Sequence, residues 1–267
     1  MVSSVLALHV LCGFIGLLAF WVAVLSKKGS TLHLRFGKAF VFCVYGIALT
    51  AIVVVTSRIL DAVALGKTVT THPSSFAAPF FLAYLALTTY GSTYLAIAVV
   101  RTKAAPQTIN TPIYKIIVIA QVIASFLIIA FALTYKPSLT ALLLSLSPIG
   151  FLNALAMQRY VNRTHIKMQW LYTHLGSILG AGIVFHTAFF VFGANRLGIL
   201  ALPAHLQLIP WLAPAIIGIP VANLWEKRYR KKFGDLPNKV TAKSPIPSKI
   251  EASQVPSRNM AIPSCQK

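Results

Sequence analysis

Long apolar stretches separated by short polar or basic loops run through the first 225 residues of the chain. Each stretch has about 20 residues, the length that an α-helix needs to cross the hydrocarbon core of a bilayer. The chain lacks the repeated strand-like alternation of a membrane β-barrel, so helices with internally satisfied backbones are expected. The pattern predicts an all-α, polytopic transmembrane helix bundle with seven spans, at residues 3–26, 39–65, 78–100, 113–135, 138–157, 169–194 and 208–224.

Basic residues alternate between the loops and predict the orientation of the chain. Most Lys and Arg lie in the segments 27–38, 101–112, 158–168 and 226–232. The intervening loops hold one basic residue each: Lys67, Lys136 and Arg196. Since cytoplasmic loops carry the excess of Lys and Arg, the N-terminus is predicted outside and the C-terminus in the cytoplasm.

Composition agrees with a membrane protein and argues against a nucleic-acid partner. The chain is 57% hydrophobic and only 10% charged, whereas soluble domains average about 25% charged residues. The net charge of +20 sits in short loops and near the C-terminus, as membrane topology requires. We therefore expect the lipid bilayer, and no nucleic acid, as a partner.

The chain divides into two predicted regions, a helix bundle at 1–225 and a basic tail at 226–267. The tail is rich in Pro, Ser and Lys and is expected to be disordered, because it has little to bury. Its first segment, EKRYRKKF, could bind anionic lipid headgroups. Ordinary anchoring of a cytoplasmic end explains the same residues and is the simpler interpretation.

Acidic residues and catalytic motifs are scarce. Of the four acidic residues, Asp61, Glu226, Asp235 and Glu251, only Asp61 lies in a predicted span. No carboxylate pair for hydrolysis and no buried acidic proton relay is therefore predicted. The three cysteines form no metal or disulfide motif. Phosphate-binding loops and hydrolase motifs are also missing from the sequence.

Four histidines remain as candidate cofactor ligands. The predicted topology places His9 and His186 about 10 Å below the outer surface, and His33 and His174 near the inner surface. Histidines from different helices at one depth could ligate haem b or a metal ion. The spacing of His174 and His186 counts against two stacked haems, because twelve residues turn a helix by about 120°. Glycines near these histidines permit close helix packing or leave room for a flat ring.

Two other function classes stay open. The polar middle of the span at 78–100, Asn153 and the proline-rich span at 208–224 could form the cavity of a small-solute transporter. Alternatively, the protein is a structural or assembly factor whose histidines are hydrogen-bonded packing residues. A transporter predicts a polar cavity that reaches the middle of the membrane, and a redox protein predicts paired imidazoles.

Three segments resemble a family of predicted bacterial multi-pass inner-membrane proteins whose function is unassigned. They are LHVLCGFIG at 8–16, KGSTLHLRFGK at 28–38 and HLGSILGA at 174–181. Here Arg35 stands one place later than the family's Arg, and Lys38 replaces its final Arg. The resemblance implies a location in the bacterial inner membrane and supplies no activity.

Overall fold

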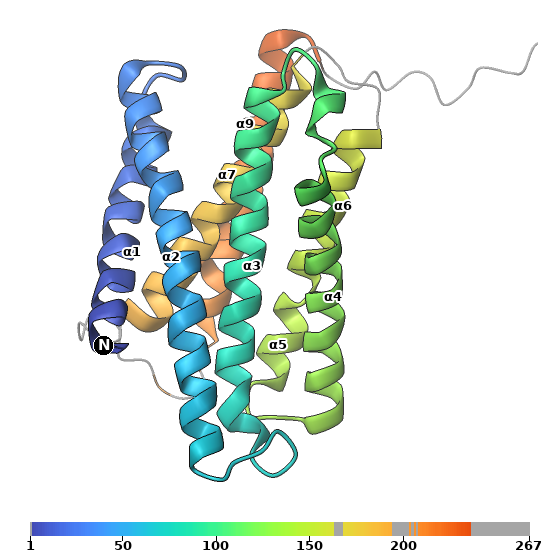
Figure 1. Ribbon diagram of the computed structural model, residues 1–267. Helices are drawn as coiled ribbons and strands as arrows, with labels where there is room; N and C mark the ends of the chain where they lie inside the picture. Colours follow the sequence, from blue (N-terminus) through green and yellow to red (C-terminus); the bar gives the residue numbers. More distant parts are fainter. Residues whose placement is uncertain (1, 163–167, 194–202, 204–205, 207, 236–267) are drawn as a thin grey trace, which may run out of the picture. The chain divides into compact units, whose positions relative to one another are not determined.

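The computed structural model describes residues 2–162, 168–193, 203, 206 and 208–235. These residues form helices and loops, with no strand among them (Figure 1). The elements are α1 (Val2–Leu25), α2 (Thr31–Ala64), α3 (Pro73–Arg101), η1 (Pro106–Ile109), α4 (Pro112–Tyr135), α5 (Thr140–Leu146), α6 (Pro148–Asn162), α7 (Gln169–Ala188), η2 (Phe189–Gly193) and α9 (Ile209–Phe233). The predicted all-α class is confirmed.

Six helical stretches of the described chain are long and apolar enough to cross a membrane, which indicates a multi-pass membrane protein. They are Ser3–Leu25, Thr31–Ala64, Pro73–Arg101, Pro112–Tyr135, Thr140–Asn162 and Gln169–Gly193. These six correspond to the first six predicted spans. Helix α9 is not among them, because its apolar part contains three prolines and ends at Glu226.

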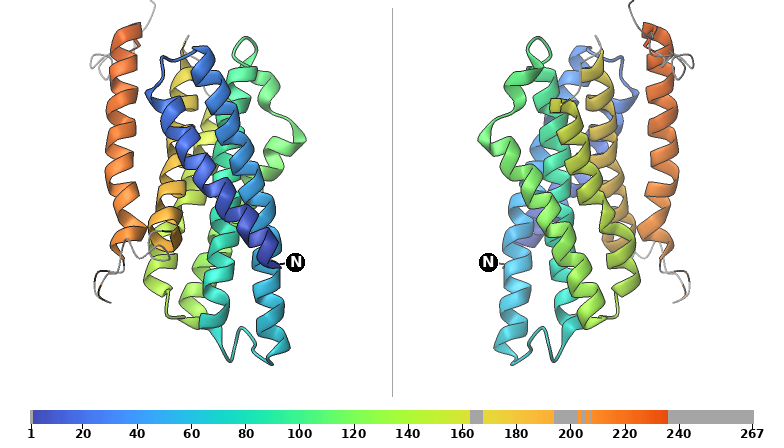
Figure 2. Two further views of the ribbon diagram at one scale, coloured as in Figure 1. Left: turned by 90° about the vertical axis from the view of Figure 1, so that its left-hand side faces the viewer. Right: turned by 90° about the vertical axis from the view of Figure 1, so that its right-hand side faces the viewer.

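Helix α9 nevertheless packs along the length of α7, in the opposite direction (Figure 2). The rings of Trp211 and Phe192 lie 5.6 Å apart near one end. A Cβ atom at Gly218 would lie 2.5 Å from the Ile183 side chain midway along the pair. At the other end, Tyr172 contacts Asp235.

The charged end of α9 is ordered, which changes the predicted boundary at residue 226. The helix continues to Phe233, and the compact unit of the chain extends from Met1 to Asp235. Residues 226–233 are therefore helical, and they do not belong to a disordered tail. The part of the predicted tail from 236 onward lies outside the described residues.

Helix α3 is the most buried of the six candidate spans, with 56% of its most apolar window buried against 22–39% in the others. The threonine and serine side chains in its middle are buried: Thr88, Thr89, Ser92 and Thr93. The outer faces of other helices expose large apolar side chains instead, such as Phe42 at 75% and Leu18 at 69%. Because hydrocarbon cannot hydrogen-bond to hydroxyl groups, the polar helix occupies the interior of the bundle.

The fifth span is broken between α5 and α6, where Pro148 lacks a backbone N–H. Tyr84 of α3 bonds to the backbone on both sides of this break. Its hydroxyl donates to the Ser147 carbonyl oxygen over 2.6 Å and accepts from the Gly150 N–H over 2.7 Å. The break is therefore stabilised from a neighbouring helix, which satisfies backbone groups that lipid would leave unpaired.

Glycines let α1 and α7 approach each other closely. A Cβ atom at Gly182 would lie 2.2 Å from the Phe20 ring, and one at Gly16 would lie 2.5 Å from the Phe185 ring. Phenylalanine rings thus occupy the space beside both glycines. Of the two interpretations that the sequence left open, close helix packing applies at these positions, and no space is left there for a porphyrin.

Candidate functional site

The outer pair of predicted ligands, His9 and His186, does not come together. His186 contacts Trp21, which lies twelve residues after His9 and about 18 Å from it along α1. His9 contacts α2 instead, where its Nδ1 atom lies 2.8 Å from the Thr50 hydroxyl. The prediction that these two histidines share one depth is wrong, because α7 crosses α1 farther along its length than the loop boundaries suggested.

Both ring nitrogens of His186 are already engaged. Its Nε2 atom accepts a hydrogen bond from the Trp21 indole over 2.9 Å, so this nitrogen carries no proton. Its Nδ1 atom donates to the Gly182 carbonyl oxygen over 2.7 Å. The rings of Phe20 and Trp21 pack edge-on against the imidazole. In this structure His186 is a neutral packing residue that offers no nitrogen to a metal.

The inner pair, His33 and His174, lies in one neighbourhood. His174 is close enough to interact electrostatically with His33 and Lys28. The Nδ1 atom of His33 lies 2.9 Å from the Ala23 carbonyl oxygen, and that of His174 lies 2.8 Å from the Ala96 carbonyl oxygen. Since a carbonyl oxygen only accepts, both Nδ1 atoms carry a proton, and in the neutral form of each imidazole the Nε2 atom keeps a lone pair. The described residues contain no cluster of three or more His, Cys, Asp or Glu side chains suited to a metal ion.

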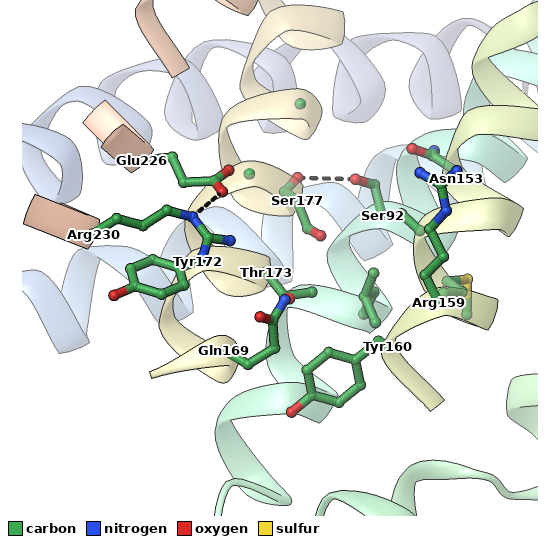
Figure 3. A pocket seen from close by; sticks show the side chains of 15 residues that line it. Ser92, Asn153, Arg159, Tyr160, Gln169, Tyr172, Thr173, Ser177, Glu226 and Arg230 are labelled. Atoms are coloured by element: carbon green, nitrogen blue, oxygen red, sulfur yellow. Dashed lines mark hydrogen bonds and ion pairs between the residues drawn. The ribbon is translucent and has the colours of Figure 1, made fainter. Parts of the chain in front are cut away.

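A partly open pocket of about 390 Å³, here called the cavity, lies between α3, α6, α7 and α9 (Figure 3). Its volume lies at the small end of the range for ligand sites, which is roughly 300–1,000 Å³. Most of its lining side chains carry amide, hydroxyl or charged groups: Ser92, Asn153, Arg159, Tyr160, Gln169, Tyr172, Thr173, Ser177, Glu226 and Arg230. Small or apolar residues complete it: Leu95, Ala156, Met157, Gly176 and Gly180.

The cavity reaches from the basic ends of the helices toward their middle. Ser92 lies nine residues before Arg101, the last residue of α3, and Asn153 lies nine residues before the end of α6. Gly180 lies eleven residues after Gln169, the first residue of α7. At a rise of about 1.5 Å per residue, these positions lie roughly 15 Å from the helix ends, half the thickness of a hydrocarbon core of about 30 Å.

Hydrogen bonds between helices fix the deep walls of the cavity. The Ser92 hydroxyl donates to the Ser177 carbonyl oxygen over 2.9 Å and joins α3 to α7. The Asn153 amide donates to the Thr88 carbonyl oxygen over 3.1 Å and joins α6 to α3. The walls are therefore held by specific polar contacts as well as by packing.

A chain of charged and aromatic contacts holds the end of α9 at the cavity. Glu226 accepts a hydrogen bond from Arg230 over 2.7 Å, and the Arg230 guanidinium lies 4.2 Å from the centre of the Tyr172 ring. The Tyr172 hydroxyl donates to Asp235 over 2.7 Å. Two of the four acidic residues of the chain thus take part in this α7–α9 clasp, which consists of Tyr172, Glu226, Arg230 and Asp235.

Sequence reasoning identified part of the cavity. Of the residues predicted to form a cavity, Asn153 and Ser92 line it. The other polar residues in the middle of α3 and the predicted span at 208–224 do not line it. Sequence reasoning assigned Glu226 and Arg230 to the tail and so missed them. The available signal was the i,i+4 spacing of an acid and an arginine, which favours a continuing helix.

Comparisons with protein-family models, with curated proteins and with solved structures find no match for this chain. The resemblance to bacterial inner-membrane proteins therefore stays a prediction from short segments.

Proposed function

We propose that the protein binds a small polar solute in the cavity between α3, α6, α7 and α9 and transports it across the membrane. The observation that carries this proposal is the cavity of about 390 Å³, lined by many polar residues, which extends roughly 15 Å from the helix ends toward their middle. A protein with a purely structural role gains nothing from such a space, because polar groups in a membrane interior are unfavourable unless they are paired or used.

The broken fifth span supports the same function. Discontinuous helices near the middle of the membrane are common in secondary transporters, where they shape substrate sites. Here α6 begins at Pro148 after the break and contributes Asn153 to the cavity. The Tyr84 hydroxyl bonds to the backbone at the start of α6.

We further propose that α9 is the seventh span and that the basic helix ends face the cytoplasm of a bacterial cell, at the inner membrane. The alternation of basic loops supports this orientation. The cavity then opens toward the cytoplasm in the conformation described here. Exposed basic residues at the end of α9, such as Lys227, Arg228 and Lys231, could contact anionic lipid headgroups.

A pair of glycine substitutions tests the transport proposal. A Cβ atom at Gly176 or at Gly37 would meet no atom within 4 Å, but only Gly176 lines the cavity. We expect Gly176→Leu to abolish solute binding and uptake by proteoliposomes, and Gly37→Leu to preserve both. The panel should contain small sugars, amino acids, organic acids and their amides. If no solute binds to the wild-type protein, or if Gly176→Leu leaves binding intact, the proposal is wrong.

Haem b ligation by the inner histidines is the second candidate function. The observation that favours it is the arrangement of His33 and His174, which lie in one neighbourhood with their Nδ1 protons on backbone carbonyls. In metal sites, a hydrogen bond from the non-ligating ring nitrogen to a backbone carbonyl fixes the orientation of the histidine that ligates the metal. A reduced-minus-oxidised absorption spectrum, recorded from cells supplied with haem, tests this candidate. Cytochrome bands that vanish in His174→Ala support it, and a featureless spectrum removes it.

A further inference from the structure

Resting on the proposed solute cavity, we infer that the ligand is a small carboxylate monoanion and that Arg159 binds its carboxylate group. Arg159 lines this cavity and has no hydrogen bond or ion pair within the described part of the chain. The inference specifies the chemical class of the solute, which the cavity volume alone does not.

The charges that line the cavity leave one positive charge uncompensated. Among the described residues, the charged residues that line the cavity are Arg159, Glu226 and Arg230. Glu226 is paired with Arg230 over 2.7 Å, so these two charges offset each other. Within the described part of the chain, no hydrogen bond or ion pair engages Arg159. A ligand with a single negative charge therefore brings the cavity to neutrality.

Arginine is also the side chain best suited to a carboxylate. Its planar guanidinium presents parallel N–H groups that match the two carboxylate oxygens, and it stays charged in any environment. A dianion such as phosphate would need a second uncommitted cation, and Arg230 is already committed to Glu226 and to the Tyr172 ring. The cavity thus favours a monocarboxylate over a phosphate ester.

The remaining lining groups can bind the rest of such a molecule. Figure 3 shows Arg159 and Asn153 on one side of the cavity, with Glu226 and Arg230 on the opposite side. Hydroxyl and amide groups, including Thr173 and Gln169, are available for a polar substituent. Leu95, Ala156 and Met157 supply an apolar surface for a short carbon skeleton.

The competing explanation is that Arg159 only anchors the cytoplasmic end of α6. Arg101 provides a matched control, because both arginines are exposed and lie in the last turn of their helices, but only Arg159 lines the cavity. If Arg159 is only an anchor, Arg159→Gln and Arg101→Gln should behave alike. If Arg159 binds the ligand, only Arg159→Gln should alter recognition of the charge.

The experiment uses the full-length protein in phosphatidylcholine nanodiscs and pairs of isosteric probes: glycolate and glycolamide, lactate and lactamide, benzoate and benzamide. For each pair that binds, calorimetry should show the acid binding at least tenfold more tightly than its amide, as expected for a charged hydrogen bond. Arg159→Gln should remove this preference, Arg159→Lys should restore part of it, and Arg101→Gln should retain it.

The possible results distinguish failure of the anion inference from failure of the proposed function. If acid and amide bind equally well to the wild-type protein, the anion inference is wrong and the solute cavity stands. An acid preference that survives Arg159→Gln also overturns the inference. If neither acids, amides nor the neutral solutes of the wider panel bind, the proposed function fails together with the inference.

Discussion

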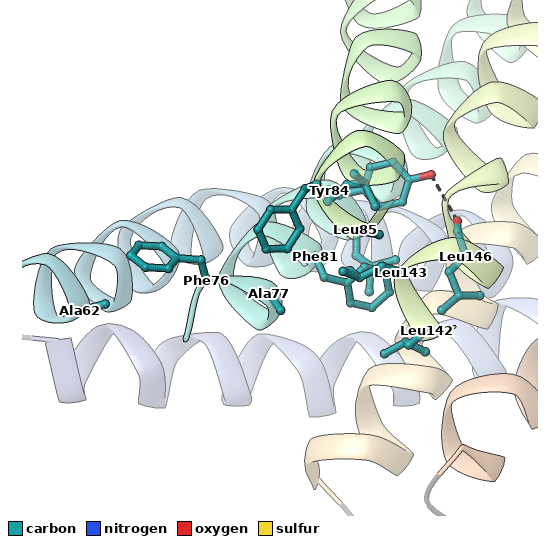
Figure 4. Packing of buried hydrophobic residues seen from close by; sticks show 12 residues of the cluster. Ala62, Phe76, Ala77, Phe81, Tyr84, Leu85, Leu142, Leu143 and Leu146 are labelled. Carbon is teal, nitrogen blue, oxygen red and sulfur yellow. Dashed lines mark hydrogen bonds between the residues drawn. The ribbon is translucent and has the colours of Figure 1, made fainter. Parts of the chain in front are cut away.

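The two halves of α3 have opposite surroundings, although they belong to one continuous helix. The half from Phe76 to Leu85 packs against α5 and neighbouring helices in a cluster of large side chains, such as Phe81, Leu142 and Leu143 (Figure 4). The half from Thr88 to Val99 carries hydroxyl groups and borders the cavity. One half lies in a cluster of large apolar side chains, and the other borders the cavity.

The difference comes from the helices that each half meets. Leucines of α5 and phenylalanines of α3 fill the space at the packed end. At the other end, α7 presents Gly176, Ser177 and Gly180, whose small side chains cannot fill the gap toward α3 and α6. In this molecule, stability and ligand binding are therefore expected to respond to substitutions in different halves of α3.

The largest effect is expected from Phe81→Ala in the packed half. Phe81 is 1% exposed, and truncating a buried phenylalanine lowers stability by about 3–5 kcal/mol. Phe42→Ala is the matched control, because Phe42 is 75% exposed on the outer face of the bundle. Thermal unfolding in detergent should show a large decrease in the melting temperature for Phe81→Ala alone. Equal decreases for the two variants would mean that this end is not tightly packed.

Tyr84→Phe should have the next largest effect on stability. It removes the hydroxyl that bonds to the Ser147 carbonyl oxygen and the Gly150 N–H. Leaving buried polar groups unpaired lowers stability by about 1–3 kcal/mol. We expect a lower melting temperature with unchanged solute affinity of the folded fraction, and little change for Tyr135→Phe, whose ring is 37% exposed. Loss of solute affinity in folded Tyr84→Phe would show that the break and the cavity are coupled.

Asn153→Leu should lower solute affinity more than stability. Asn153 lines the cavity and contributes one hydrogen bond, to the Thr88 carbonyl oxygen. The loss of one neutral hydrogen bond lowers stability by only about 1 kcal/mol. Solute affinity should fall by tenfold or more, since a bulky apolar group replaces a polar one in the cavity. Leu152→Ala on the exposed face of α6 is the control and should bind normally. Normal binding by Asn153→Leu would place the ligand elsewhere.

The smallest effect on stability is expected from Tyr172→Phe, which removes the hydrogen bond to Asp235 in the clasp. Because this bond to a carboxylate is only partly buried, at the end of the helix, solvent screening should keep the stability change below about 1 kcal/mol. The mouth of the cavity should open more often, so a Ser177→Cys probe in an otherwise cysteine-free protein should react faster with a polar thiol reagent. Tyr229→Phe, elsewhere on α9, is the control. Unchanged reactivity in Tyr172→Phe would mean that the clasp does not limit access.

Several features of this protein could be predicted from the sequence because they depend on local properties of the chain. Hydropathy located six spans that the structure supports, since the length of an apolar run is enough to decide whether a helix can cross a bilayer. Asn153 and Ser92 were among the residues predicted to line a cavity, because polar groups in a span must find partners inside the bundle.

The contacts between helices were decided only by the tertiary structure. Loop lengths did not reveal that α7 meets α1 beside Trp21, which separates His186 from His9 and uses both nitrogens of its imidazole. Nor did composition reveal that Glu226 and Arg230 belong to a helix that packs along α7. Apolar periodicity determines which segments enter the membrane, whereas side-chain shape at each crossing determines which residues meet there.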